Sequence, residues 1–360
     1  MSARLTRRSF AGGLALVGLG APHSWAQGFA GLGRDADGFA SVVPGHTLTF
    51  PTDHGPHPQF RIEWWYLTAN LTDAAGNAYG AQWTLFRQAM APNTQDSGWT
   101  TPQVWMGHAG VTSATMHHAA ETFARGGIGQ AGVTATPFRA WIDAWEMRGL
   151  DGFSDKNVAP LDVTASAESF DYRLRLDAQR PLVLQGDAGY SRKSERGQAS
   201  YYYSQPYFTA SGTLTIDGRD IAVNGQAWMD REYSSQPLAS DQTGWDWFSL
   251  HLPGDEKLML FRLRQKDGSH YFAGNWIGAD GKSAQLAPDA IAMTPLATTE
   301  IAGRKIPTSW RIAIASRGLQ IKTTPLNAQS WMATKFAYWE GPVRFSGSHD
   351  GVGYLEMTGY

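Results

Sequence analysis

Carboxylates set among tryptophans are the residues of this chain best suited to chemistry. Asp230 follows Trp228 by two positions, so in a strand both side chains point to the same face. A carboxylic acid held beside indole rings has a raised pKa and stays protonated, so it can donate its proton. Aromatic faces also stabilise a cation, so this pair suits protonation of an alkene in an apolar pocket. The alternative is structural: Asp230 and Glu232 pair with Arg231 and neighbouring arginines at a domain junction.

Two other residues are catalytic candidates. His108 shares a face with Val104 and Met106, where a lone histidine is either a general base or a satisfied core residue. Glu63 begins a strand-like segment and lies on its mostly apolar face. We expect it to pair with Arg87, either as part of a catalytic site or as a structural ion pair at the rim of a barrel.

The segments 63–71 and 79–87 alternate in the way that predicts a β-hairpin. A turn centred near Ala75 fixes the register, unless a bulge at Gly76 slips it. The predicted cross-strand pairs are Glu63–Arg87, Trp65–Leu85 and Leu67–Trp83.

Aromatic and charged residues close to these acids are expected to line the pocket. Asp246 is not among them, because it lies between two tryptophans and points to the opposite face. The expected ligand-binding residues are Trp64, Trp65, Tyr66, Trp83, Trp228, Arg231, Glu232, Trp245, Trp247 and Trp339.

A loop rich in histidine and aspartate offers the only metal candidates, which are Asp53, His54 and His57, with His46 nearby. Imidazole with carboxylate suits zinc or iron. Prolines at 56 and 58 make the spacing irregular, however, and no second cluster completes a tetrahedral set. The alternative is an ordered loop in which Asp53 and His54 bond backbone amides. We expect that loop, with no metal and no cofactor.

The composition excludes several classes of protein. The 360 residues are 42% apolar and 17% charged, with 40 glycines and 15 tryptophans, which favours a β-rich globular protein with many turns. The net charge is −2 and no Lys/Arg block follows the N-terminus, so we expect no nucleic-acid partner. The absence of cysteine removes disulfides, thiolate metal sites and cysteine nucleophiles. The chain also lacks the Gly-x-Ser-x-Gly, P-loop and His-Glu-x-x-His motifs.

The first 26 residues are predicted to be a twin-arginine signal peptide. Arg7 and Arg8 precede a short apolar stretch from Ala11 to Ala21, and small residues precede an expected cleavage after Ala26. The apolar stretch is too short to span a bilayer. We therefore expect export to the periplasm and no transmembrane segment after cleavage, the alternative being a short basic tail.

The rest of the chain is predicted to be all-β. Short aromatic and β-branched runs alternate with Gly/Asp/Asn turns, and the best helix candidate is the short segment Ala114–Arg125. The polar segment Ser234–Thr243 is the best linker. We expect an extended arm over 27–45, an N-terminal barrel over 46–235 and a C-terminal barrel over 236–360, because barrels remove exposed strand edges.

Several motifs resemble those of a known family, the AttH-type secreted lipocalin-like proteins of the carotenoid 1,2-hydratase (hydroxyneurosporene synthase) superfamily. The resemblance covers nearly all of the expected mature chain and implies two lipocalin-like antiparallel β-barrel domains packed together. The motifs that carry it are Asp53–His57, Glu63–Tyr66, Gly107–His108, Gln185–Ser191, Tyr201–Pro206, Gly225–Glu232, Gly244–Trp247, Tyr338–Gly341 and Gly353–Tyr360.

The resemblance implies a class of ligand and several activities. The superfamily includes hydratases that protonate a terminal carotenoid double bond and add water, and fungal relatives that act as pericyclases. AttH-type members are often labelled secreted hydrolases. Carotenoid hydratases typically carry an Asp-His-Asn-Trp-like stretch where this chain has Asp230-Arg231-Glu232-Tyr233, so the aspartate is kept and the histidine is replaced.

We expect a periplasmic protein that binds an apolar or lipid-like small molecule, isoprenoid or carotenoid-like. It would act on that ligand as a cofactor-free lyase, hydratase or isomerase. One alternative is a non-catalytic carrier or chaperone that serves a lipoprotein or ABC-type export system, and another is a secreted hydrolase. A catalyst should turn two proton-sharing groups, such as Glu63 or Asp230 with His108, toward one enclosed pocket. A carrier should have only salt-bridged carboxylates there.

Overall fold

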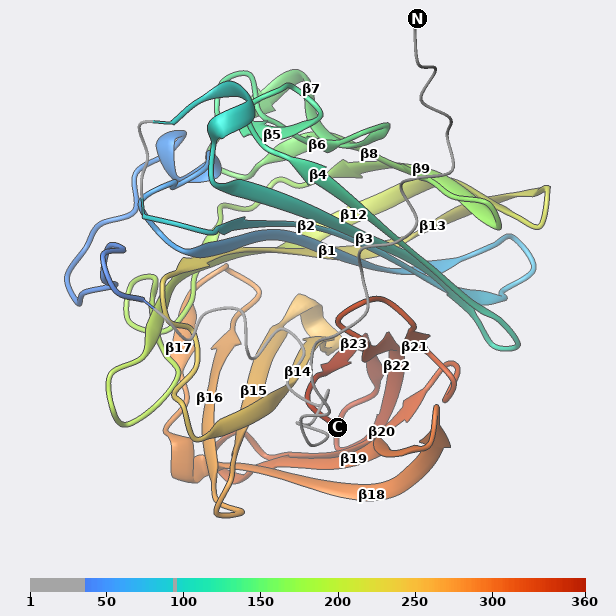
Figure 1. The fold of residues 1–360 in the computed structure, drawn as a ribbon. Coiled ribbons are helices and arrows are strands. Elements are labelled where there is room, and N and C mark those ends of the chain that lie inside the picture. Colours follow the sequence, from blue (N-terminus) through green and yellow to red (C-terminus); the bar gives the residue numbers. More distant parts are fainter. Residues whose placement is uncertain (1–35, 93–95) are drawn as a thin grey trace, which may run out of the picture.

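The structure, a computed structural model, describes residues 36–92 and 96–360. The predicted signal peptide and the first part of the predicted arm lie outside the described residues. Almost all of the regular structure is strand, in two antiparallel sheets that each curl into a barrel-like domain (Figure 1). This arrangement confirms the predicted all-β fold with two barrels.

The first sheet has thirteen strands and holds the chain from β1 to β13. Its order is β4-β3-β2-β1-β13-β12-β9-β8-β7-β6-β5, with β10 and β11 also paired to β12. Its strands are β1 (Ile62–Thr72), β2 (Ala78–Ala89), β3 (Gln103–Ser113), β4 (His117–Arg125), β5 (Ala131–Thr134), β6 (Arg139–Ile142), β7 (Trp145–Ser154), β8 (Ala159–Ser166), β9 (Phe170–Asp177), β10 (Val183–Leu184), β11 (Tyr190–Arg192), β12 (Ala199–Ile216) and β13 (Arg219–Ser234).

The second sheet has ten strands, and its order is β17-β16-β15-β14-β23-β22-β20-β19-β18, with β21 paired to β22. Its strands are β14 (Gln242–His251), β15 (Lys257–Gln265), β16 (His270–Ile277), β17 (Ser283–Gln285), β18 (Ile291–Ile301), β19 (Arg304–Ile314), β20 (Leu319–Pro325), β21 (Trp331–Met332), β22 (Tyr338–Gly347) and β23 (Gly351–Met357). The described helices are all 3-10 turns, namely η3 (Thr52–His54), η4 (Gly98–Thr100), η5 (Pro253–Asp255), η6 (Pro288–Ala290) and η7 (Ala315–Arg317).

The strands follow from an alternating pattern of apolar residues. In β9, the side chains of Phe170, Tyr172, Leu174 and Leu176 are buried, while the residues between them are exposed. Successive side chains of a strand point to opposite faces, so this spacing of two lets β9 bury one face inside the first barrel and leave the other in water.

The register of the first hairpin is as predicted. β1 and β2 pair Glu63 with Arg87, Trp65 with Leu85 and Leu67 with Trp83. The Asp73 carboxylate accepts hydrogen bonds from the backbone N–H groups of Ala75 and Asn77, which fixes the turn. No bulge interrupts the pairing.

The predicted helix over Ala114–Arg125 is wrong, because β4 (His117–Arg125) occupies most of that segment. β4 pairs antiparallel with β3 over nine residues, from Thr112↔His117 to Val104↔Arg125. The hydrogen bonds of this ladder outweigh the weak helical preference of the segment.

Each barrel has its own core, and a third apolar cluster lies between the barrels. The third cluster includes Tyr66 and Trp228 from the first barrel and Trp247 and Phe261 from the second. β1 and β13 therefore bury both faces, one in the first barrel and one against the second. Figure 1 shows β1 and β13 on the side of the first barrel that faces β14 and β23.

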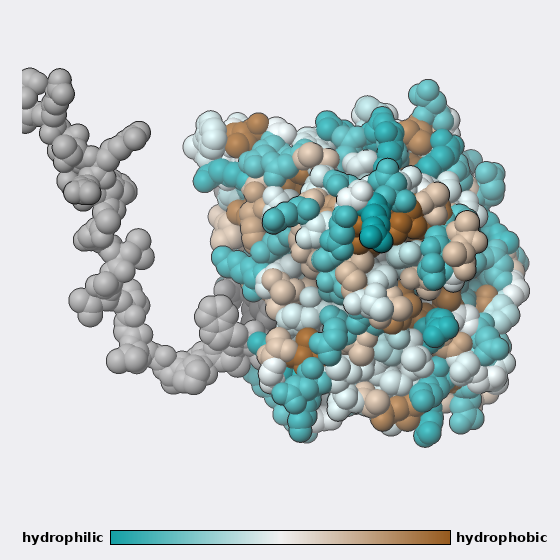
Figure 2. Space-filling view, turned by 90° about the vertical axis from the view of Figure 1, so that its right-hand side faces the viewer, coloured by the Kyte–Doolittle hydropathy of each residue, from teal (hydrophilic) through white to brown (hydrophobic). Residues whose placement is uncertain are grey.

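The outer surface is of mixed polarity. On the face shown in Figure 2, hydrophilic side chains are spread among small, separate apolar groups. Among the described residues, no helix has the length and apolar character needed to cross a membrane.

Candidate active site

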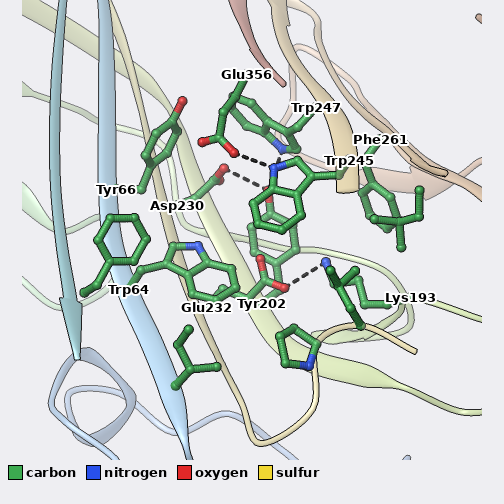
Figure 3. Close-up of a pocket in the computed structure, with 15 residues that line it drawn as sticks. Trp64, Tyr66, Lys193, Tyr202, Asp230, Glu232, Trp245, Trp247, Phe261 and Glu356 are labelled. Carbon is green, nitrogen blue, oxygen red and sulfur yellow. Dashed lines mark hydrogen bonds and ion pairs between the residues drawn. The ribbon is translucent and has the colours of Figure 1, made fainter. Parts of the chain in front are cut away.

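A pocket with about 820 Å³ of empty space, part of it open to solvent, lies between the two barrels (Figure 3). It is lined from the first barrel by Ile62, Trp64, Tyr66, Phe86, Lys193, Tyr202, Asp230 and Glu232, from the connecting segment by Pro237 and Leu238, and from the second barrel by Trp245, Trp247, Phe261, Leu263 and Glu356. The largely apolar lining with a few polar groups is typical of small-molecule sites.

The register between β1 and β13 decides which side chains reach this pocket. Tyr66 pairs with Asp230 and Trp64 pairs with Glu232. Because paired residues of antiparallel strands share a face, these four side chains point out of the first barrel toward the second. Arg231, one position along β13, points into the barrel instead.

Asp230 is buried and forms no ion pair within the part of the chain that the structure describes. Its Oδ1 accepts hydrogen bonds from the Ser204 hydroxyl at 2.5 Å and the Trp228 indole at 2.7 Å, and its Oδ2 accepts one from the Tyr202 hydroxyl at 2.8 Å. Burial raises the pKa of Asp230 to about 7, although these three hydrogen bonds oppose the rise. Near neutral pH this group can therefore give up a proton or take one up.

Glu356 lies on β23 of the second barrel, and its carboxyl group is next to that of Asp230 (Figure 3). The Trp245 indole donates a hydrogen bond to it. Burial raises the pKa of Glu356 to about 7, and the nearby charges of Asp230 and Glu232 add to the rise. The pocket thus holds two carboxyl groups whose pKa values both lie near 7, and the charge of Asp230 raises the pKa of Glu356.

Glu232 differs from these two acids because it is ion-paired. The Lys193 ammonium lies 2.8 Å from its Oε1, and Ser200 also donates a hydrogen bond to it. Lys193 is held over the rings of Tyr202 at 5.0 Å and Phe261 at 4.4 Å. This lysine and glutamate form a neutral, polar border to one side of the pocket.

Glu63 lies inside the first barrel, away from the pocket. It is fully buried and forms ion pairs with Arg87 and Arg231, and the His57 backbone N–H donates to it at 2.9 Å. Burial alone would raise the pKa of Glu63, but the two arginines outweigh burial and hold it well below its usual range. The residue is therefore a fixed anion in an ion network, not a partner of Asp230.

Asp53, His54 and His57 do not converge on one point. His57 lies between Asp53, at 3.1 Å, and Glu63, at 3.3 Å, and stacks on Tyr233. The two ring nitrogens of His54 instead hydrogen-bond the Tyr203 hydroxyl and the Asp155 backbone carbonyl. In residues 36–92 and 96–360, no three His, Asp or Glu side chains are arranged to hold a metal ion.

His108 lies on the outer face of the first barrel but does not line the pocket. Its Nδ1 lies 3.1 Å from the Tyr338 hydroxyl of the second barrel, and its Nε2 lies 3.0 Å from Glu121. Burial lowers the pKa of His108, against the opposing effect of Glu121. The structure thus pairs Asp230 with Glu356, not with His108 or Glu63.

Several of the predicted ligand-binding residues lie elsewhere. Trp65 and Trp83 belong to the core of the first barrel and Trp339 to that of the second. Arg231 stacks on Trp65 inside the first barrel, at 3.9 Å from the ring, so it does not pair with Asp230 or Glu232 as the structural alternative assumed. Trp228 does not line the pocket, but its indole N–H donates a hydrogen bond to Asp230. The pocket itself contains the predicted residues Trp64, Tyr66, Glu232, Trp245 and Trp247.

Sequence reasoning missed Glu356, Lys193 and Tyr202. Glu356 shares a face of β23 with Tyr354, and this alternation in the C-terminal motif was the available signal. Tyr202 lies in a run of three tyrosines whose neighbours point into the first barrel. Nothing local marks Lys193, because its partners come from β12, β13 and β15.

The fold and site together define a protein of two lipocalin-like barrels with an acid-lined apolar pocket between them. The AttH-like family model matches residues 41–360. The chain therefore belongs to the AttH-like family. No curated protein sequence matches the chain.

Solved structures agree with this assignment. A protein assigned to AttH from Nitrosomonas europaea is 32% identical, with a TM-score of 0.79 over 89% of this chain and 99% of that one. Kievitone hydratase from Nectria haematococca is 17% identical, with a TM-score of 0.66 over 91% and 98%. CghA, solved with Sch210972, is 14% identical, with a TM-score of 0.53 over 90% and 97%. The last two likenesses show the shared fold.

Proposed function

We propose that this protein is a cofactor-free hydratase or isomerase that binds an apolar, isoprenoid-like small molecule between its barrels. One observation carries the proposal. Buried Asp230 and partly buried Glu356, each with a pKa raised to about 7, face the same largely apolar pocket. Neither has an ion-pair partner among the described residues, whereas a simple carrier would need no such acids.

The geometry supports a two-carboxyl mechanism. Protonated Asp230 donates its proton to a carbon–carbon double bond, and the aromatic faces of Trp64, Trp245 and Trp247 stabilise the resulting cation. In a hydration, water adds to the cation and its surplus proton passes to Glu356. In an isomerisation, Glu356 removes a proton from a neighbouring carbon instead. Either path uses only the two carboxyl groups and water.

Two structures of the same fold carry names that point in this direction. Kievitone hydratase is named for a hydration, and CghA was solved with the small molecule Sch210972. Their identity to this chain is low, so they support the choice of reaction class and not the identity of the ligand. We include a periplasmic location in this proposal, which the predicted twin-arginine signal supports.

The experiment is mass spectrometry of the small molecules that co-purify with the protein from the periplasm. Wild-type protein should carry a product that differs from the ligand of Asp230→Asn by one water, or has the same mass but a different retention time. Asp177→Asn, a surface variant, should carry the wild-type product. The same unaltered ligand in all three proteins would indicate a carrier, for example one serving an ABC-type export system. Fragments of a cleaved ligand would indicate a hydrolase.

A further inference from the structure

A line of polar side chains crosses the interface between the barrels beside the pocket. On its outer half, Glu121 lies 3.0 Å from His108 Nε2, and His108 Nδ1 lies 3.1 Å from the Tyr338 hydroxyl. The His108 and Tyr338 rings also stack, with centroids 5.6 Å apart. These contacts join β4 and β3 of the first barrel to β22 of the second.

The inner half continues this line to the pocket. The Glu340 carboxyl group lies two residues along β22 from Tyr338, on the same face of the strand, and is close enough that each group shifts the pKa of the other. The Tyr66 hydroxyl donates to Glu340 Oε1 at 2.5 Å, and Tyr66 lines the pocket close to Glu356 (Figure 3). Glu121, His108 and Tyr338 thus form one hydrogen-bonded group and Glu340 and Tyr66 form a second, and the two groups meet at Tyr338 and Glu340 on β22.

The two ends of the series differ in exposure. His108, Tyr338, Glu340 and Tyr66 are all buried, at 5% exposure or less. The Glu121 side chain is 18% exposed and borders a surface hollow with Asp143 and Trp145. The line therefore runs from solvent through a dry interface to the pocket.

Burying the Glu340 carboxyl group without an ion-pair partner costs free energy, and a neutral side chain of the same size could fill its place in the interface. Glu340 lies at the interface with no arginine or lysine partner among the described residues, and burial and the charge of Glu356 raise its pKa well above its usual value. A glutamine would fill the same volume and still accept the Tyr66 hydrogen bond. A carboxyl group is needed only if the position must take up and release protons.

We propose that Glu121, His108, Tyr338, Glu340 and Tyr66 form a proton relay between solvent and the pocket. Each hop breaks one O–H or N–H bond and forms the next, so one proton enters at one end as another leaves at the other. After a proton has passed, rotation of the tyrosine hydroxyls and exchange of the His108 tautomer return the donors and acceptors to their starting arrangement. The relay serves the proposed reaction, because an apolar ligand that fills the pocket excludes the water that would otherwise return protons to its acids.

The relay is testable without knowing the substrate. The pocket is filled with N-phenyl-1-naphthylamine, a neutral apolar fluorophore, and the protein is mixed rapidly into D₂O. Infrared spectroscopy follows the C=O stretching band of the protonated Glu340 carboxyl group, identified as the band that Glu340→Gln removes. Tyr338→Phe and Glu121→Gln interrupt the line in its middle and at its outer end. Tyr207→Phe removes another interface hydroxyl, which donates to the Gly278 carbonyl, and is the matched control.

Deuterium exchange of this band should slow at least about tenfold in Tyr338→Phe and in Glu121→Gln, and stay at the wild-type rate in Tyr207→Phe. Thermal unfolding and fluorophore affinity verify that each variant is folded and filled. Exchange at the wild-type rate in both relay variants would overturn the relay, and so would equal slowing in the control. This readout is independent of turnover, so a failed relay and a failed catalytic proposal are separate results.

Discussion

Asp230 and Glu232 lie two residues apart on the same face of β13, yet their surroundings suit them to different tasks. Lys193 neutralises Glu232, whereas Asp230 receives hydrogen bonds from three neutral donors. Three such donors stabilise a carboxylate, but less than burial destabilises it, so the pKa of Asp230 settles near 7. A general acid works best when its pKa lies near the working pH, a condition that Asp230 meets and ion-paired Glu232 does not share.

Glu356 makes the stability of the folded protein depend on pH. Its pKa rises from 4.5 to about 7 on burial, so the folded state favours the protonated group. The stability contributed by that proton is complete below pH 4.5 and is lost as the pH rises through 7. Glu356→Gln cannot ionise and so avoids this loss. The free energy of unfolding of the variant, minus that of wild type, should therefore increase by about 1–3 kcal/mol as the pH rises from 4.5 to 8.

Chemical denaturation at pH 5, 6, 7 and 8 measures this difference. Glu195→Gln is the control, because the Glu195 side chain is 77% exposed, and its difference from wild type should stay constant over the same range. A constant difference for Glu356→Gln as well would show that Glu356 ionises normally in the folded protein.

At the scale of the element, β13 serves two separate sets of side chains. Its even positions, Asp230 and Glu232, face the pocket, while Arg231 enters the first barrel and pairs with Glu63. Strand alternation predicts that the side chains of Arg231 and Asp230 point to opposite faces of β13. Which of these faces lies inside the first barrel depends on the pairing of β13 with β1. The paired residues of these strands are 152 to 172 positions apart in sequence, from Thr72↔Asn224 to Ile62↔Ser234, so no local pattern fixes their register.

The first hairpin was predicted residue by residue because one short turn sets its register. Glu63 was likewise expected to lie opposite Arg87, and it does. The second arginine on Glu63 and the role of Glu356 were not predicted, since both depend on contacts between distant strands. The predicted helix over Ala114–Arg125 failed for a related reason: tertiary pairing with β3 overrides the local preference.

Gly80 of β2 lies where the two barrels pack closely against each other. A Cβ at this position would lie 2.5 Å from the Tyr354 hydroxyl and 2.7 Å from Pro342 Cγ, both in the second barrel. Gly80→Val should therefore lower the free energy of unfolding by about 1–3 kcal/mol and weaken fluorophore binding, because the barrels must move apart.

Ala78→Val adds bulk at the half-buried start of the same strand and is the matched control. Urea denaturation gives the stability, and fluorophore titration gives the affinity. Equal effects of the two variants would mean that Gly80 matters only as part of β2 and not as a contact between barrels.

At the scale of the molecule, neither barrel holds the pocket alone. Trp64 and Asp230 come from the first barrel, and Trp245, Trp247 and Glu356 come from the second. Each barrel interior is instead filled by its own core. The fold therefore places the pocket outside both barrel interiors, in an interface whose shape depends on how the two domains meet.

This arrangement predicts that an apolar ligand stabilises both barrels together. N-phenyl-1-naphthylamine at 100 times its dissociation constant should raise the free energy of unfolding by about 2.7 kcal/mol, in one transition seen alike by circular dichroism and tryptophan fluorescence. Trp64→Ala should reduce this gain, whereas Trp99→Ala, whose ring is exposed at the surface, should preserve it. If the ligand shifted only one of two separate transitions, the binding energy would be held within a single barrel. The ligand then could not draw the two carboxyl groups together, because Asp230 and Glu356 approach one another only where the barrels meet.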